Sequence, residues 1–269
     1  MQNNNLILGK KISFPKEYDP QILTSIDRNA SRISAETYRN KFYGLDRWTC
    51  YELSWLGING NPKNGVLSIE YSSESPFFIE SKSLKLYLNS YHNFIATNNI
   101  IIETITNDLR HCLKSNVSVT LLNKPHPIDQ RNLYTNLDHI PHSGVLDKVD
   151  KSLLSLSPKK EFNIYKLSCS LFRSLCPVTN QPDWATILIQ YKGRYIDESS
   201  ILSYLLSYRF HKGFHEECTE LIYTHIMLQC NPDELSIEAQ FLRRGGIDIN
   251  PFRTSLKEFS YFPYRDLRQ

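Results

Sequence analysis

Residues 80–91 read Glu80-Ser-Lys-Ser-Leu-Lys-Leu-Tyr-Leu-Asn-Ser-Tyr91, and residues 197–208 read Asp197-Glu-Ser-Ser-Ile-Leu-Ser-Tyr-Leu-Leu-Ser-Tyr208. Laid over one another without gaps, five of the twelve positions are identical. At the same offset Glu103 aligns with Glu220 and Ile105 aligns with Ile222. A repeat of this kind indicates two copies of one structural unit, so the sequence predicts a tandem architecture.

The same order of elements recurs on both sides of the repeat: strand, strand, helix, helix, strand. Alternating apolar residues predict the strands and apolar residues at three- and four-residue spacing predict the helices. In the first copy we expect strands at 48–56, 66–72 and 117–122 and helices at 84–94 and 101–112. In the second we expect strands at 162–172, 185–191, 235–242 and 258–262 and helices at 199–209 and 215–230. The predicted class is α+β, each module an antiparallel sheet with two helices packed on one face.

A proline-rich polar stretch separates the copies, with Pro125, Pro127, Pro141 and Pro158. Such composition is typical of a linker. The predicted organisation is an N-terminal module with an irregular arm at 1–125, a linker at 126–160 and a C-terminal module at 161–269.

Composition bounds the class of protein. An apolar fraction of 41% and a charged fraction of 22% are those of a globular protein, and a net charge of +3 is too small to argue for nucleic acid. The sequence has no run of eighteen apolar residues and no CxxC pair among its six cysteines. We therefore expect a cytoplasmic protein with reduced thiols and no membrane segment.

The second copy carries Cys176-Pro-Val-Thr-Asn-Gln-Pro-Asp183, a cysteine on a turn with an aspartate seven residues on. A cysteine becomes a strong nucleophile once its proton is removed, and a nearby carboxylate can move protons. Most cysteines are instead small buried hydrophobes, and an aspartate in a turn often only caps it. Both interpretations stay open on the residues alone.

The first copy serves as an internal control. The repeat aligns Cys176 with Leu56, Asp183 with Lys63 and His215 with Asn98. Conversely, Lys82 aligns with Ser199 and Lys85 aligns with Leu202, so the second copy lacks these charges. One copy keeps a nucleophile and the other a basic motif, which indicates divided roles.

Three further motifs have a structural and a functional interpretation. His215-Glu216 lies at the start of a predicted helix, where the helix dipole stabilises an acidic residue. The Glu216 carboxylate could instead accept hydrogen bonds from the N–H edge of a purine. Glu80-Ser-Lys-Ser83 is typical of a helix-capping segment, with Ser81 or Ser83 as the N-cap. The helix dipole disfavours two lysines in the first turns of a helix, so Lys82 and Lys85 favour a site that binds an anion. Arg243-Arg244-Gly245-Gly246 is a charged turn that also suits a phosphate. No GxGxxG, P-loop or metal-ligand spacing is present in the sequence.

Three strings together resemble the 7-cyano-7-deazaguanine reductases, the NADPH-dependent nitrile reductases of queuosine biosynthesis, in their two-module form. They are Glu80-Ser-Lys-Ser-Leu-Lys-Leu-Tyr87, Cys176-Pro-Val-Thr-Asn-Gln-Pro-Asp-Trp184 and Arg243-Arg-Gly-Gly-Ile-Asp-Ile-Asn-Pro-Phe-Arg253. The resemblance covers about residues 45–125 and 160–265. It implies tandem tunnelling-fold modules that form a homodimer, without a metal and without direct binding of nucleic acid.

The resemblance also implies roles. Cys176 attacks the nitrile carbon to form a covalent thioimide, Asp183 supplies protons, and two NADPH reduce the nitrile by four electrons to 7-aminomethyl-7-deazaguanine. The deazaguanine would be held by Ile79, Glu80, Ser81, His215 and Glu216. The NADPH would be held by Ser81, Lys82, Arg244 and Gly245.

Two other functions remain alternatives. A tunnelling-fold purine or pterin hydrolase would use Cys176 without NADPH, but would leave the lysines and paired arginines unexplained. A non-catalytic purine- or RNA-binding module is permitted by the pI of about 8.4, and would leave Cys176 and Asp183 without a role.

Overall fold

The computed structural model describes residues 15–37, 41–124, 126–127, 133–142, 144, 147–158 and 161–269. Its α+β class is confirmed, with long antiparallel strands and paired helices. Two compact units make up the chain. Unit 1 comprises 1–31, 45–125 and 243–249, and unit 2 comprises 32–44, 126–242 and 250–269.

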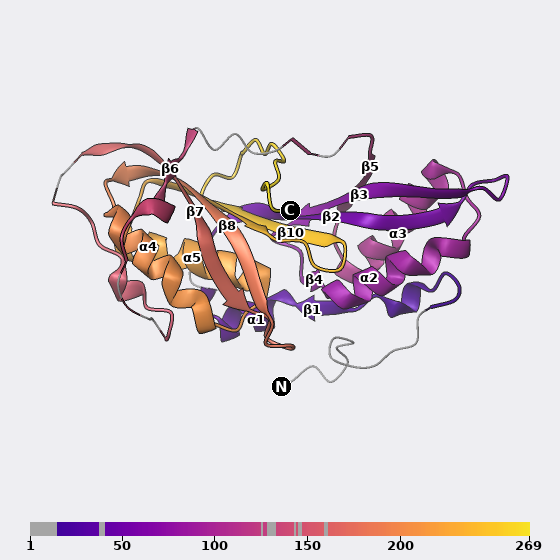
Figure 1. Ribbon diagram of the computed structural model, residues 1–269, viewed down its shortest axis with the longest axis horizontal. Helices are drawn as coiled ribbons and strands as arrows, with labels where there is room; N and C mark the ends of the chain where they lie inside the picture. The colour runs from indigo at the N-terminus through magenta and orange to yellow at the C-terminus, as the bar shows by residue number, and fades with distance from the viewer. Residues whose placement is uncertain are drawn as a thin grey trace. The chain divides into compact units, whose positions relative to one another are not determined.

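Unit 1 is built on three antiparallel strands in the order β5-β3-β2, with β2 at Tyr43–Leu56, β3 at Pro62–Ser72 and β5 at Val117–Leu122. Helices α2 (Ser81–Asn89) and α3 (Asn98–Leu113) lie on one face of these strands (Figure 1). A short ribbon of β1 (Ser25–Asp27) and β4 (Phe77–Ile79) precedes α2. The remaining elements of this part of the chain are η1 (Pro20–Ile22), α1 (Arg28–Ser34) and η3 (Ser90–Asn93).

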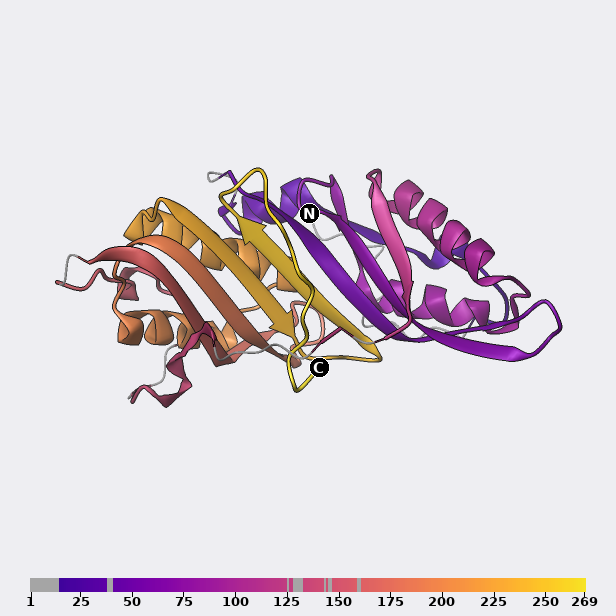
Figure 2. The ribbon, with the colours of Figure 1, turned by 90° about the horizontal axis from the view of Figure 1, so that it is seen from above.

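Unit 2 repeats this plan with β7 (Phe162–Leu175), β8 (Pro182–Arg194) and β9 (Glu234–Phe241). Its helices α4 (Glu198–Leu206) and α5 (His215–Cys230) again share one face of the strands, as Figure 2 shows from a second direction. The short β6 (Thr135–Asn136) pairs parallel to β7, and β10 (Ile247–Thr254) pairs with β9 through Phe252 to Thr254. The 3-10 turns are η5 (Leu137–His139), η6 (Lys151–Leu153) and η7 (Ser207–Phe210).

The two copies match in detail. β2 and β7 are both fourteen residues long, with a bulge between Cys50 and Leu53 in one and between Cys169 and Phe172 in the other. α3 and α5 are both sixteen residues long. A buried tyrosine pair with hydroxyls 2.6 Å apart recurs as well, Tyr87 with Tyr91 and Tyr204 with Tyr208. The predicted tandem repeat of strands and helices is therefore confirmed.

Part of the predicted linker resembles the N-terminal arm. Asp19 caps η1 and Asp150 caps η6. The hydroxyl of Ser200 accepts a bond from the Ser155 N–H at 3.2 Å, as Ser83 does from Thr24 at 3.1 Å. Each arm thus runs along the first helix of its own copy.

One predicted strand is wrong. Residues 258–262 form no strand, and the last strand of unit 2 is β10, which contains Pro251. Instead, Phe259 and Tyr261 pack their rings on Phe252 of β10, with centroids 5.4 and 5.2 Å away. The alternation of the segment therefore reflects ring packing and not ladder pairing. Over the described part of the chain, no helix is long and apolar enough to cross a membrane.

Candidate active site

Cys176 follows the last residue of β7 and begins the turn that leads into β8. Its N–H donates to the Gln181 carbonyl at 2.9 Å, and its carbonyl accepts from Asn180 at 3.0 Å. Asn180 takes a left-handed conformation (φ 56°), which asparagine tolerates well. The thiol is 7% exposed, and the Thr179 N–H lies 3.5 Å from Sγ, directed at the sulfur.

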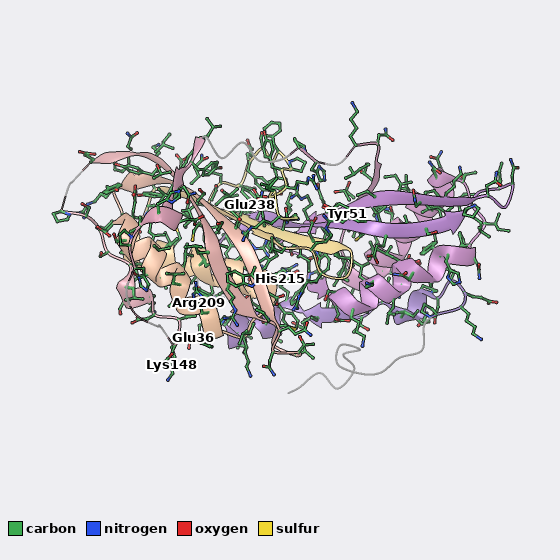
Figure 3. The ribbon with its side chains drawn as sticks, in the orientation of Figure 1. Glu36, Tyr51, Lys148, Arg209, His215 and Glu238 are labelled. Atoms are coloured by element: carbon green, nitrogen blue, oxygen red, sulfur yellow. The ribbon has the colours of Figure 1, made fainter. Side chains whose placement is uncertain are left out.

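Asp183 and His215 meet on the helix-facing side of the sheet. The ladder pairs Leu175 with Pro182 and Ser174 with Asp183, so Asp183 lies beside the end of the strand that delivers Cys176. Asp183 is 4% exposed, and its Oδ2 lies 3.5 Å from Nε2 of His215. His215 is the first residue of α5, against the strands of unit 2 (Figure 3). The structure therefore brings together the predicted nucleophile segment, acid and histidine.

The start of α5 is fixed by local bonds. Glu217 accepts the Phe214 N–H at 2.7 Å, the bond that the third helical residue makes in a capping box. Leu175 donates to His211 at 2.8 Å and accepts from Gly213 at 3.2 Å, so the segment before α5 is tied to the strand that ends at Cys176. Glu216, the second helical residue, is 3% exposed. A buried carboxylate at a helix N-terminus suits a ligand with N–H donors.

Sequence reasoning did not identify Phe241. Its ring stacks on the His215 imidazole, with centroids 3.8 Å apart and planes 5° apart. No motif marks this residue, because its position depends on strand register: Phe241 pairs with Ala185 in β8, two residues after Asp183.

In unit 1, Glu80 is itself the N-cap of α2, and the expectation of Ser81 or Ser83 as cap is wrong. The Glu80 carboxylate accepts the Lys82 N–H at 2.9 Å and the Ser83 N–H at 2.7 Å. Burial raises the pKa of Glu80, and these two backbone bonds oppose the rise. Ile79 lies in β4 with only 2% of its surface exposed.

Arg244 and Gly245 lie in a tight turn of unit 1. Arg244 and Ile247 exchange backbone bonds at 2.9 and 3.1 Å, and both intervening glycines have positive φ, 56° and 77°. A Cβ on Gly245 would lie 2.8 Å from Lys85 Nζ, and one on Gly246 would overlap the Glu52 carboxyl carbon. Lys85 Nζ also lies 3.5 Å from Glu52 Oε2.

This turn places cationic side chains beside glycine backbone. The glycines leave the backbone bare beside the ammonium of Lys85, and the exposed Arg243 and Arg244 add two guanidiniums. The Arg243 guanidinium lies 4.1 Å from the ring centroid of Tyr51, which is labelled on β2 in Figure 3. Bare backbone with clustered cations is a chemistry that binds phosphate.

The structure refines the comparison between copies. Leu56 and Leu175 both end a fourteen-residue strand and both pair with a proline, Pro62 or Pro182. Gly57 therefore occupies the place of Cys176, and the alignment with Leu56 is one residue off. Lys63 matches Asp183 and Asn98 matches His215, as predicted. The first copy lacks the nucleophile, the acid and the histidine.

The two copies and their unequal residues define a tandem α+β protein in which only the second copy carries the cysteine, the aspartate and the histidine. The family model "Nitrile reductase, 7-cyano-7-deazaguanine-reductase N-term" matches residues 14–121, and "QueF-like protein" matches residues 182–259. A solved structure, the apo archaeosine synthase QueF-Like, aligns at 19% identity over 37% of this chain and 95% of its own, with a TM-score of 0.31.

Curated relatives extend over nearly the whole chain. A protein of Saccharophagus degradans is 38% identical, covering 94% of this chain and 95% of its own length. One from Coxiella burnetii is 37% identical (97% and 96%), and one from Bordetella parapertussis is 35% identical (100% and 100%). All three are named NADPH-dependent 7-cyano-7-deazaguanine reductase. The chain belongs to the 7-cyano-7-deazaguanine reductase family, whose tandem tunnelling-fold modules correspond to the two copies described above.

Proposed function

We propose that this chain is an NADPH-dependent oxidoreductase that reduces the nitrile of 7-cyano-7-deazaguanine to 7-aminomethyl-7-deazaguanine, a step of queuosine biosynthesis in tRNA modification. The observation that carries the proposal is the grouping at the end of β7, where the buried Cys176 thiol faces a backbone donor and Asp183 meets His215. Family membership at 35–38% identity over nearly the full length supplies the substrate and the cofactor.

The proposed chemistry begins at Cys176. Its sulfur forms a bond to the nitrile carbon, one carbon–nitrogen π bond breaks, and the nitrogen takes a proton supplied through Asp183. Covalent capture keeps the substrate in place until the first hydride has been delivered. Bound NADPH would supply a hydride to that carbon in each of two rounds. Between them the carbon–sulfur bond breaks, the Cys176 thiolate leaves and an imine forms, which the second hydride and further protons convert to the amine.

The remaining site residues are proposed from the family resemblance. His215 and Glu216 would contact the deazaguanine together with Ile79, Glu80 and Ser81, and Ser81, Lys82, Arg244 and Gly245 would contact NADPH. The structure adds Lys85 to the cations beside Gly245, which supports the assignment of this turn to a phosphate. The two oxygens of Glu80 that bind α2 keep further lone pairs for a ligand.

The proposed organisation is that of the sequence: a module at 1–125, a linker at 126–160 and a module at 161–269. We further propose a homodimer, because modules of this fold close by pairing with other copies. The proposed compartment is the cytoplasm, supported by six cysteines that are all free thiols.

The test is NADPH oxidation with and without the nitrile, in the wild type, in Cys176→Ala and in Cys230→Ala. Cys230 is a matched control, a buried thiol of unit 2 at the far end of α5. We expect about two NADPH consumed per nitrile, none by Cys176→Ala and normal turnover by Cys230→Ala.

Two further readouts separate the alternatives. Cys176→Ala should still bind the nitrile by calorimetry, and the wild type without NADPH should gain the mass of one nitrile per chain. Turnover by Cys176→Ala would refute the covalent mechanism. Nitrile-independent hydrolysis of a purine or pterin would favour the hydrolase.

A further inference from the structure

His215 lacks the usual device that orients a functional histidine. A catalytic imidazole is normally fixed by a hydrogen bond to the ring nitrogen that does not face the reaction. In His215, Nε2 faces Asp183 at 3.5 Å, and the buried Nδ1 has no hydrogen-bond partner among the described residues. Something else must fix the plane of this ring.

Phe241 supplies that constraint. Its ring lies flat on the imidazole, 3.8 Å away, and is itself 1% exposed. Phe241 pairs with Ala185 in the ladder, and side chains two residues apart on a strand share a face, so Phe241 and Asp183 both lie on the face that His215 covers. Phe172 packs edge-on against Phe241, with ring centroids 6.1 Å apart and planes at 86°.

Gln269 in turn secures the end of β9. Its side-chain amide donates to the Phe241 carbonyl at 2.7 Å and to Asn250 Oδ1 at 2.6 Å, while its Oε1 accepts the Asp266 N–H at 2.7 Å. Gln269 is 3% exposed. All polar atoms of this side chain are engaged, so the carbonyl beside the stacked ring is held by a rigid partner.

The first copy provides a comparison. Tyr71 pairs with Val117 as Tyr191 pairs with Leu235, which aligns Asn123 with Phe241. Where the second copy has the His215–Phe241 stack, the first has Asn98 and Asn123, both exposed. The aromatic partner is therefore present only in the copy that has the histidine, which a purely structural role for Phe241 would not require.

We infer that Phe241 is a positioning residue for the proposed nitrile reduction, holding the His215 imidazole against Asp183, and that Gln269 holds Phe241 in place. The expected effect on kcat rests on the proposed function. The expected effect on the position of the His215 ring does not. The test compares Phe241→Leu with Phe172→Leu, the same substitution of a fully buried ring in the same core that does not stack on His215.

In the protein without substrate, NMR of the His215 ring protons, assigned with His215→Gln, reports the stack directly. We expect the upfield ring-current displacement to disappear in Phe241→Leu and to persist in Phe172→Leu. In turnover, kcat of Phe241→Leu should fall about tenfold with KM for the nitrile changed less than threefold, because misplacement of a reacting group affects the chemical step. Phe172→Leu should lower the thermal midpoint as much while keeping kcat within about twofold.

Gln269→Ala should move kcat and the ring signals in the same direction, and should add little to Phe241→Leu in the double variant. Should Phe241→Leu fold poorly, Phe241→Met keeps the volume without the flat face. Equal kcat in Phe241→Leu and Phe172→Leu, or unchanged ring signals, would overturn the inference. If no protein reduces the nitrile but the ring signals shift as expected, the proposed function fails and the positioning of His215 stands.

Discussion

Asp183 is the residue whose surroundings bear most directly on proton transfer. It is 4% exposed, close to Nε2 of His215, and opposite Ser174 on the neighbouring strand. A carboxyl held in this way can pass a proton to a nitrogen, whereas an amide of the same shape cannot.

We therefore expect Asp183→Asn to lower kcat by about 10²–10⁴-fold, the range typical of general acid–base groups. The isosteric amide should leave the thermal midpoint within a few degrees of the wild type. Steady-state NADPH oxidation and a thermal melt check both statements. A kcat within tenfold of the wild type would remove Asp183 from the proton path.

His225 gives a prediction on pH. Its Nδ1 lies 2.9 Å from the Tyr204 hydroxyl, and burial, with contributions from Lys151 and His211, lowers the pKa of His225 to about 4. An unfolded histidine titrates near 6.5, so between pH 6.5 and 4 the unfolded chain binds a proton that the folded chain does not. Stability due to this group is complete above pH 6.5 and is lost as the pH falls.

Allowing for partial exposure of the ring, the loss should be about 1–2 kcal/mol. Urea unfolding at pH 7.5 and pH 4.5 measures it, with His225→Asn as the variant that lacks the titration. An equal loss of unfolding free energy in both proteins would show that His225 does not contribute.

At the scale of elements, the order and type of most of the main strands and helices could be predicted from the sequence, but most of their exact ends could not. The expected ranges of β5 and α5 agree with the structure at both ends, because their apolar periodicity is uninterrupted. The strand expected at 258–262 was wrong because alternation alone does not provide a partner strand. The one-residue error at Gly57 arose because the β2–β3 turn has one residue fewer than the β7–β8 turn, and a gapless alignment cannot place the gap.

The diglycine turn before β10 allows a matched experiment. Gly246 and Gly60 have nearly the same φ, 77° and 75°, but a Cβ on Gly246 would overlap Glu52, whereas one on Gly60 would meet nothing within 4 Å. Gly60→Ala should cost only the backbone strain, about 1–2 kcal/mol. Gly246→Ala should cost more and should also raise KM for NADPH.

Denaturant unfolding and NADPH titration of both variants measure these effects. An equal unfolding cost would mean that Glu52 moves aside freely. An unchanged KM for NADPH in Gly246→Ala would argue against a phosphate at this turn.

At the scale of the whole molecule, unit 2 is held by a charge cluster that joins segments distant in sequence. Glu220 of α5 lies 2.9 Å from the Arg32 guanidinium and 2.9 Å from that of Arg253. Glu220 is 2% exposed and Arg253 is fully buried. The repeat predicted that Glu220 corresponds to Glu103, but not that one of the two would be buried, because its partners come from outside the repeated segment.

Removing the charge of Glu220 leaves two guanidiniums without their carboxylate. Glu220→Gln should therefore lower the free energy of unfolding by about 3–5 kcal/mol. Glu103→Gln, the exposed counterpart in the first copy, should change it by less than about 0.5 kcal/mol. Urea titrations of both variants measure these changes. Similar losses of unfolding free energy in the two variants would contradict the predicted contribution of the charge cluster.

The glycine that replaces the nucleophile in the first copy has an evolutionary consequence. A Cβ on Gly57 would lie 2.9 Å from Cε of Lys63, so a cysteine could return only if the lysine side chain gave way. Such a thiol would still face Lys63 where Asp183 stands and Asn98 where His215 stands, and no single one of these replacements restores proton transfer. Building the same group of side chains in the first copy would take three substitutions together: Gly57→Cys, Lys63→Asp and Asn98→His. Cys176 thus has no ready substitute in the first copy, and loss of this one residue cannot be compensated by the duplicated half of the chain.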